Sequence, residues 1–370
     1  MQLSLQGIGK AVGGEMHLAD ISAELTSGLN VVLGPTGSGK TSLLRLIAGL
    51  DRPTAGKLLL DGRDITALGV NLRNAAMVYQ QFVNYPSFTV YDNIASPLRQ
   101  GKSHDAREID RRVREAAALL HIEPMLDRLP SQLSGGQQQR TAIARAIVKD
   151  AELLLLDEPL VNLDYKLREE LRAEMRNLFI QRKTIVVYAT TEPSEALLLG
   201  GSTMVLDQGR VLQFGPTLQT YHHPVSTRVG TIFSDPSMNL LDAKIEGAQL
   251  HLSADLAFGL PAHMADLPAG QYRIGVRATH VSLSPNGADA IPALADVDLA
   301  EISGSETFLH LRHGPLNFIA QVEGVHPFGL GAQVTVYLNR ARLYAFDGGG
   351  KLVGAPIIGD IREGSGHGTH

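Results

Sequence analysis

A chain of 370 residues with 44% hydrophobic and 19% charged residues has a globular composition and is long enough for two domains. Its net charge of -5 shows no excess of basic residues, which nucleic-acid-binding proteins usually have. The absence of cysteine excludes disulfides and thiolate metal sites. No segment approaches the roughly 20 apolar residues of a membrane-spanning helix, so we expect contact with a membrane only through a partner.

The first part of the chain alternates short apolar runs with helical patterns. Four consecutive leucines predict one strand that is buried on both faces. The alternation predicts an α/β domain over residues 1–235. Strands are predicted at 29–33, 153–156, 184–188 and 203–206, and a helix at 40–50.

The residues from Gly34 to Thr41 match the pattern G-x-x-x-x-G-K-[ST] between a predicted strand and a predicted helix. Glycines let the main chain wrap around phosphates, with N–H groups pointing inward at a helix N-terminus. Lys40 is expected to reach the β- and γ-phosphates, and the Thr41 hydroxyl to bind Mg²⁺. A chance glycine-rich turn is the competing interpretation, which the strand–loop–helix context disfavours. We assign nucleotide binding to Gly34, Pro35, Thr36, Gly37, Ser38, Gly39, Lys40, Thr41 and Ser42.

Two acidic residues, Asp157 and Glu158, directly follow the leucine run. A buried strand delivers such residues to the carboxyl edge of a parallel sheet, where ligands bind in α/β folds. Asp157 is expected to support Mg²⁺, and Glu158 to orient or deprotonate an attacking water. A solvated surface pair is the alternative, which the four preceding leucines argue against.

Beyond residue 235 the sequence changes to short alternating runs separated by Gly, Pro and Asn. This texture predicts a small all-β barrel over residues 236–360. The last residues, 361–370, are small and polar, and we expect a disordered tail. Strand-like runs occur at 250–252, 272–276, 281–283, 309–311, 318–322 and 334–338.

A further motif, Leu133-Ser134-Gly135-Gly136-Gln137, stands between the phosphate loop and the acidic pair. With this LSGGQ signature the chain resembles the ATP-binding-cassette (ABC) ATPases, over residues 1 to about 232. Gln80 matches the glutamine loop of that family and Asp164 its D-loop. The resemblance implies a P-loop ABC ATPase fold that binds ATP and Mg²⁺.

In that family two nucleotide domains pack head to tail, so each ATP lies between one phosphate loop and the signature of the other chain. Gln80 is implied to contact Mg²⁺, with Thr41 and Asp157, or to contact the attacking water together with Glu158. The further nucleotide contacts that the resemblance implies are Ser134, Gly135, Gly136, Gln137 and Asp164.

Two positions depart from the family pattern on the nucleotide-facing side. Thr191 occupies the place of a catalytic histidine and offers a shorter, uncharged side chain. Val12 occupies the place of an aromatic residue that stacks on adenine. Because both changes affect this chain's own site while its signature is intact, we expect a heterodimer in preference to a homodimer.

The second domain is similar to that of carbohydrate-importer ATPases of the maltose-uptake type, at 212–216, 221–224, 235–239, 275–280 and 343–347. The similarity implies an oligonucleotide/oligosaccharide-binding (OB-fold-like, TOBE) barrel that serves regulation and dimer contacts. It also implies an ATPase that powers bacterial import of a carbohydrate or polyol. Glycerol is one candidate, because glycerol importers of this family use two different ATPases.

The implied partners are a second ATPase subunit, two transmembrane permease subunits and a periplasmic or lipoprotein solute-binding protein, without nucleic acid. We expect the chain to be peripheral at the cytoplasmic face of the inner membrane. We expect the permease to dock around Gln80 to Leu98, where the apolar and aromatic residues 81–88 suit a groove for a short helix of the permease. An ordinary core-facing loop is the alternative.

Two alternatives remain open: an ATPase homodimer in a sugar or glycerol-phosphate importer, and a nucleotide-binding regulatory subunit with little hydrolysis at its own site. DNA-repair and chromosome-maintenance cassette ATPases are disfavoured, because they carry long coiled-coil insertions and this sequence has none. Translation-linked cassette proteins usually carry two cassettes, and this chain has one phosphate loop.

Overall fold

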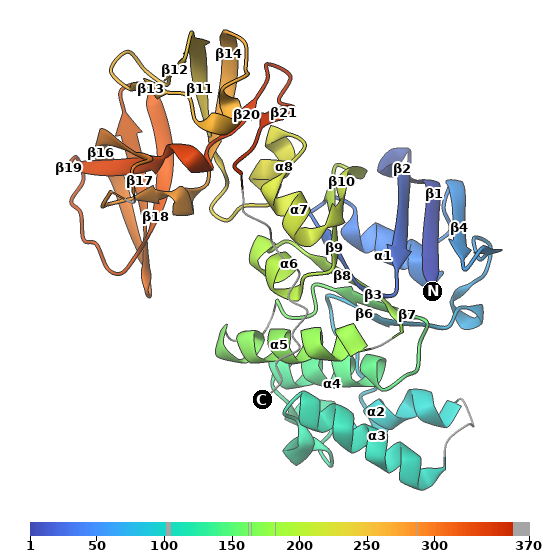
Figure 1. The fold of residues 1–370 in the computed structure, drawn as a ribbon. Helices are drawn as coiled ribbons and strands as arrows, with labels where there is room; N and C mark the ends of the chain where they lie inside the picture. Colours follow the sequence, from blue (N-terminus) through green and yellow to red (C-terminus); the bar gives the residue numbers. More distant parts are fainter. Residues whose placement is uncertain (101–104, 162, 164, 182, 286, 358–370) are drawn as a thin grey trace, which may run out of the picture. The chain divides into compact units, whose positions relative to one another are not determined.

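The computed structural model describes residues 1–100, 105–161, 163, 165–181, 183–285 and 287–357. The chain forms two compact units, Met1–Thr217 and Leu218–His370 (Figure 1). The α/β character predicted for the first part and the all-β character predicted for the second are confirmed. The predicted tail at 361–370 lies outside the described residues.

A six-stranded sheet in the order β10-β9-β3-β8-β7-β6 forms the core of the first unit. β10 is antiparallel to β9, and the other strands are parallel. Every residue of β7 and β8 is buried, which confirms the strand predicted from the leucine run. The carboxyl ends of the parallel strands meet at one edge, where ligands bind in such sheets. The strands are β3 (Gly28–Leu33), β6 (Ala75–Val78), β7 (Leu153–Asp157), β8 (Ile185–Thr190), β9 (Ser202–Asp207) and β10 (Arg210–Pro216).

A second, antiparallel sheet of this unit has the order β2-β1-β4-β5. Helix α1 (Lys40–Ala48) shares one apolar core with both sheets. Leu44 of α1, Leu3 of β1 and Leu155 of β7 all belong to that core. The strands are β1 (Gln2–Val12), β2 (Glu15–Thr26), β4 (Ala55–Leu60) and β5 (Arg63–Asp64).

Among the described residues, α2, α3 and α4 lie between β6 and β7 in the sequence, and α4 contacts α2, α3 and β6. Helix α5 contacts α6, and both contact β3. The helices are α2 (Val90–Gln100), α3 (Ala106–Leu119), α4 (Gly135–Ile147), α5 (Tyr165–Gln181) and α6 (Pro193–Leu199), with 3-10 turns η1 (Val70–Leu72), η2 (Glu123–Met125) and η3 (Pro130–Gln132).

The second unit has two antiparallel sheets, in the orders β13-β12-β11-β14-β20-β21 and β15-β19-β16-β17-β18, which share one apolar core. The strands are β11 (Asn239–Glu246), β12 (Gln249–His251), β13 (Ala257–Gly259), β14 (Gly270–Val276), β15 (Val281–Ser282), β16 (Ala290–Ser303), β17 (Glu306–His313), β18 (Leu316–Glu323), β19 (Gln333–Asn339), β20 (Tyr344–Phe346) and β21 (Leu352–Gly354). The 3-10 turns are η4 (Ala262–Met264), η5 (Ala278–His280) and η6 (Arg340–Arg342).

Two short helices, α7 (Thr217–His222) and α8 (Thr227–Ile232), precede these strands. Buried Arg277 holds them to the barrel, because its guanidinium donates to Tyr221 O at 2.6 Å and to Phe233 O at 2.9 Å. The same guanidinium lies 3.6 Å from the centre of the Tyr221 ring. The change of sequence texture near residue 235 therefore marks the first strand of the barrel, whereas the compact unit already begins at Leu218.

Candidate functional site

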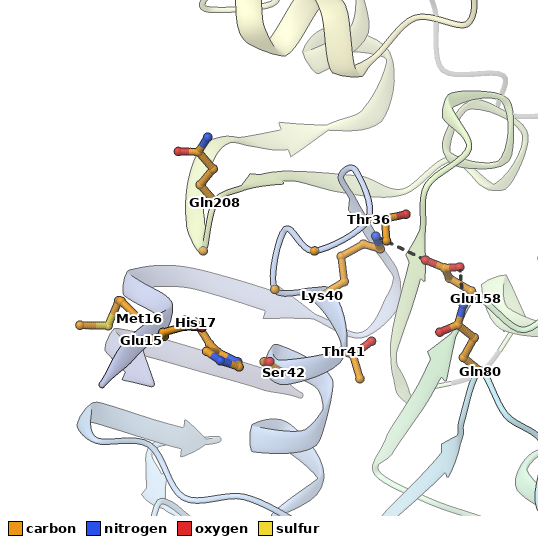
Figure 2. Close-up of a pocket in the computed structure, with 13 residues that line it drawn as sticks. Glu15, Met16, His17, Thr36, Lys40, Thr41, Ser42, Gln80, Glu158 and Gln208 are labelled. Atoms are coloured by element: carbon orange, nitrogen blue, oxygen red, sulfur yellow. Dashed lines mark hydrogen bonds and ion pairs between the residues drawn. The ribbon is translucent and has the colours of Figure 1, made fainter. Parts of the chain in front are cut away.

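A cavity of about 500 Å³ opens at the start of α1, close to the carboxyl ends of β6 and β7 (Figure 2). It brings together the phosphate loop, the residue after β7 and Gln80, as the sequence predicts. The lining residues are Glu15, Met16, His17, Thr36, Gly37, Gly39, Lys40, Thr41, Ser42, Gln80, Glu158, Gln208 and Gly209.

The loop from Gly34 to Gly39 follows the buried strand β3 and turns directly into α1. At Gly34 a Cβ atom would lie 2.2 Å from Leu206 O, so only glycine fits beside β9. Gly39 has a φ of 104°, and a Cβ there would lie 2.9 Å from His17 O. Both glycines are thus required by close main-chain approach, and they leave the first N–H groups of α1 directed at the cavity.

The Lys40 side chain is only 4% exposed although it carries a charge. Its Nζ donates to Gly34 O at 2.8 Å and to Pro35 O at 3.1 Å, and it lies 3.4 Å from Glu158 Oε1. Burial lowers the pKa of Lys40, and the carboxylates of Glu158 and Asp157 oppose that shift. The ammonium group is therefore held inside the loop, where it can neutralise phosphate oxygens.

Asp157 ends β7 and is 2% exposed. The Thr41 hydroxyl donates to its Oδ2 at 2.8 Å, whereas its buried Oδ1 has no hydrogen-bond partner. Burial raises the pKa of Asp157, because the charged form loses its hydration. A free carboxylate oxygen beside a hydroxyl, with the Gln80 amide near the same cavity, is a set of oxygen donors that fits Mg²⁺.

Glu158 adopts a φ of 46°, a left-handed conformation that is costly for a residue with a side chain. Its N–H donates to Ala189 O at 3.0 Å, which fixes the turn against β8. Gln80, two residues after β6, donates from Nε2 to Glu158 Oε2 at 3.2 Å. As Figure 2 shows, the Glu158 carboxylate lies between Lys40 and Gln80, which suits a group that orients or deprotonates water.

The opposite wall of the cavity contains residues that sequence analysis did not select. Met16 and His17 belong to β2, and Gln208 and Gly209 form the turn between β9 and β10. Gly209 N donates to Ser38 O at 2.9 Å, so this turn contacts the phosphate loop directly. The Gln-Gly turn between two strands was readable from the sequence, but its proximity to the phosphate loop was not.

Several predicted site residues are not among those that line the cavity: Gly34, Pro35, Ser38 and Asp157, and also Val12 and Thr191. Val12 is 48% exposed at the end of β1, and Thr191 is half-buried just after β8. The segment after β8 is firmly anchored, because Glu192 N donates to Thr190 Oγ1 at 3.0 Å and Thr190 Oγ1 donates to Glu195 Oε2 at 2.5 Å. Their roles at a nucleotide remain predictions.

The predicted signature begins α4 and lies away from this cavity. Ser134 is the exposed N-cap, and its Oγ accepts from Gln137 N at 3.3 Å. In return Gln137 Oε1 accepts from Ser134 N at 3.0 Å, which completes a capping box. The residues Gly135 and Gly136 follow in the first turn of an accessible helix N-terminus. Predicted Asp164 lies outside the described residues.

The model of the ABC transporter family matches residues 18–161. The chain is 36% identical over 360 residues to the sn-glycerol-3-phosphate import ATP-binding protein UgpC of Brucella abortus, covering 95% of this chain and 99% of that protein. This chain belongs to the ABC transporter ATPases.

Other ABC ATPases match over similar lengths. The UgpC proteins of Psychromonas ingrahamii and Pectobacterium atrosepticum are 36% and 34% identical, and each match covers 93% of this chain and 93% or 97% of the relative. Among solved structures, the dimeric ATP-binding cassette MJ0796, in a post-hydrolysis state bound to ADP and Pi, matches 58% of this chain and 98% of its own, with a TM-score of 0.54 and 28% identity.

Membership in this ATPase family assigns ATP binding and hydrolysis to the chain. Within the described ranges, none of the helices combines the length and apolar character that crossing a membrane requires.

Proposed function

We propose that this ABC ATPase is a peripheral subunit at the cytoplasmic face of a bacterial membrane, where it powers import of a carbohydrate or polyol. The names of the relatives, sn-glycerol-3-phosphate import proteins, support a solute of this class. The observation that carries the hydrolytic role is the Glu158 carboxylate, held at the mouth of the phosphate loop by Lys40 and Gln80.

In the reaction, the phosphate loop and Lys40 bind the β- and γ-phosphates, which neutralises charge that develops on the transferred group. Glu158 orients the attacking water and accepts its proton. Thr41, Asp157 and Gln80 are the residues that would hold Mg²⁺, which would supply charge neutralisation at the phosphates. Gln80 contacts Glu158 and is followed by the exposed segment 81–88, so it would report the state of the site to that surface.

The exposed signature supports a head-to-tail dimer in which Ser134 to Gln137 complete the site of a partner chain. Val12 and Thr191 weaken only this chain's own site. We therefore propose a heterodimer with a different ATPase subunit, whose site supplies most of the hydrolysis. The dimeric state of the cassette MJ0796 supports the pairing of two such domains.

The surface proposed for the two permease subunits is the segment 83–88, where Val83, Tyr85 and Phe88 are 59%, 44% and 41% exposed. Buried Asn93 fixes this segment, because its amide donates to Tyr85 O at 3.1 Å and Phe88 O at 3.0 Å. Arg145 adds a bond to Val83 O and lies 5.0 Å from the Tyr85 ring centre. Exposed apolar side chains on a rigid support are typical of a protein-docking surface.

The test is copurification of the tagged chain with its membrane complex and identification of the associated solute-binding protein. ATPase activity is measured for the chain alone and with a second cassette subunit. Turnover that requires a different cassette subunit supports the heterodimer. Full turnover by the chain alone would favour a homodimer, and no contribution to turnover in any assembly would favour a regulatory subunit.

The docking surface is tested by Tyr85→Asp and Phe88→Asp, which should prevent copurification of the permease while the chain stays folded. Leu198→Asp is the control, since Leu198 is 49% exposed on α6, and it should leave the complex intact. Intact complexes with both aromatic variants would place the docking surface elsewhere.

A further inference from the structure

Arg73 is a buried cation whose hydrogen bonds go to main-chain carbonyls. It is 5% exposed and lies two residues before β6. Two of its bonds reach the C-terminal end of α1, and the others reach the loop after β5. The acceptors are Leu46 O at 2.6 Å, Ile47 O at 2.7 Å, Ile65 O at 2.7 Å, Leu68 O at 2.9 Å and Thr66 O at 3.2 Å.

The end of a helix is a suitable environment for this cation. The last carbonyls of α1 have no partner within the helix and carry the negative end of its dipole. Burial lowers the pKa of Arg73, but a guanidinium stays protonated at any physiological pH. Arg73 thus adds charged donors to this helix end, where Leu46 O also accepts from Gly49 N at 3.1 Å.

The position of Arg73 is fixed from two further directions. At Gly49, which closes α1 with a φ of 78°, a Cβ atom would lie 2.8 Å from Arg73 Nε. Within the main chain, Ala75 N donates to Arg73 O at 2.8 Å as β6 begins. This side chain therefore links the end of α1 to the start of β6, in addition to the packing of Ala75 and Met77 of β6 against the apolar core of α1.

Helix α1 and strand β6 each position a residue that contacts the Glu158 carboxylate. Among the described residues, β6 is the edge strand of its sheet and pairs with β7, and it is followed by Gln80, whose Nε2 lies 3.2 Å from Glu158 Oε2. Helix α1 begins with Lys40, whose Nζ lies 3.4 Å from Glu158 Oε1. Arg73 connects the C-terminal end of α1 to the N-terminal end of β6, whereas Lys40 and Gln80 lie at the other ends of these two elements. It therefore fixes the position of Gln80 relative to Lys40 and Glu158.

We propose that Arg73 is a positioning residue for ATP hydrolysis, which places Gln80 beside Glu158 by fixing β6 against the end of α1. The planar guanidinium offers five donors in a fork, whereas a lysine ammonium offers three from one point and cannot reach both segments. Since a displacement of about 1 Å at a reacting group can cost roughly 100-fold in rate, a small movement of β6 is enough to slow hydrolysis.

The test begins with Arg73→Lys in the full chain. We expect single-turnover hydrolysis at this chain's own site, at saturating ATP, to fall about tenfold, while ATP affinity in equilibrium binding stays within about twofold. The matched control is Arg45→Lys, since Arg45 lies on the same helix end but is 42% exposed and pairs with Asp51 at 2.8 Å. The control should change neither quantity. The wild-type rate in this assay tests hydrolysis itself, on which the inference rests.

A double-mutant cycle with Gln80→Ala distinguishes positioning from general destabilisation. If Arg73 acts through Gln80, Arg73→Lys slows the wild type but adds little in the Gln80→Ala background. Equal fold losses in both backgrounds, or a loss of ATP binding together with turnover, would overturn the proposal. If Arg73→Lys does not fold, Gly49→Ala replaces it in the cycle, because the methyl group of the new alanine would contact the Arg73 guanidinium. Additive losses of turnover for Gly49→Ala and Gln80→Ala would again overturn the proposal.

Discussion

The residues on the two sides of the nucleotide cavity differ in how deeply they are buried. On the phosphate side, Ser38, Lys40 and Asp157 are 2%, 4% and 2% exposed, and hydrogen bonds or ion pairs fix Lys40 and Asp157. On the other side, Met16 is 62% exposed, and Val12, which does not line the cavity, is 48% exposed. The two departures from the family pattern, Val12 and Thr191, both lie outside the cluster around Lys40.

Burial explains this difference. A change at Lys40 or Asp157 leaves a buried partner unpaired, which costs the folded protein roughly 1–3 kcal/mol or more. A change at an exposed position such as Val12 costs folding little, usually less than about 0.5 kcal/mol. The phosphate side is thus constrained by both folding and chemistry, whereas the outer side is constrained by nucleotide contacts alone.

The largest expected effect is that of Lys40→Ala. Loss of the cation inside the loop should weaken ATP binding about 10- to 100-fold, since a charged hydrogen bond contributes roughly 1.5–3 kcal/mol. Equilibrium titration with a fluorescent nucleotide measures this. Lys10→Ala is the control, because Lys10 lies on β1 and its Nζ bonds Arg52 O at 2.9 Å. Undiminished affinity of Lys40→Ala would reject the assignment of the phosphate side.

A second test compares Ser134→Arg with Glu158→Gln in the assembled transporter. Ser134→Arg would block the competent site of the partner, and transport should fall roughly 100-fold. Glu158→Gln removes the base of the slower site and should lower transport only about twofold. Asp105→Ala controls for cap loss, since Asp105 caps α3 through Glu108 N at 2.8 Å. Equal damage by the first two variants would show that the sites are equivalent or both required.

Val12→Tyr should strengthen ATP binding at the outer side of the cavity. If residue 12 reaches the adenine, an aromatic ring there should raise ATP affinity about fivefold, since base stacking contributes roughly 1–3 kcal/mol. The control is Val70→Tyr, at a residue that is 42% exposed in η1. An unchanged affinity would indicate that the adenine contacts Met16 or His17 instead, both of which line the cavity.

Thr191→His should have the smallest effect, a rise in turnover of about twofold at this chain's own site. The main chain at this position is already anchored by the bond from Glu192 N to Thr190 Oγ1. Single-turnover hydrolysis by the chain measures the change, and Thr191→Gln is the control of similar size. No gain with histidine would show that the site is limited elsewhere, with Val12 as the next candidate.

The sequence was most informative where function depends on the main chain. The glycines of the phosphate loop are a local pattern, and the structure places them between the predicted strand and the predicted helix. The leucine run placed Asp157 and Glu158 at a buried strand end correctly. The outer wall was missed, because Met16 and Gln208 line the cavity only through the packing of β2 and the β9–β10 turn against the loop.

Motif, element type and family therefore follow from the sequence alone, because each depends on residues within one turn or one strand. Folding decided which distant side chains meet: Glu158 between Lys40 and Gln80, and Arg73 against the end of α1. Such contacts join segments that are dozens of residues apart, and their geometry is set by sheet order and helix packing. A pattern read along one chain carries no record of that order, since the same local motifs are compatible with several arrangements of strands.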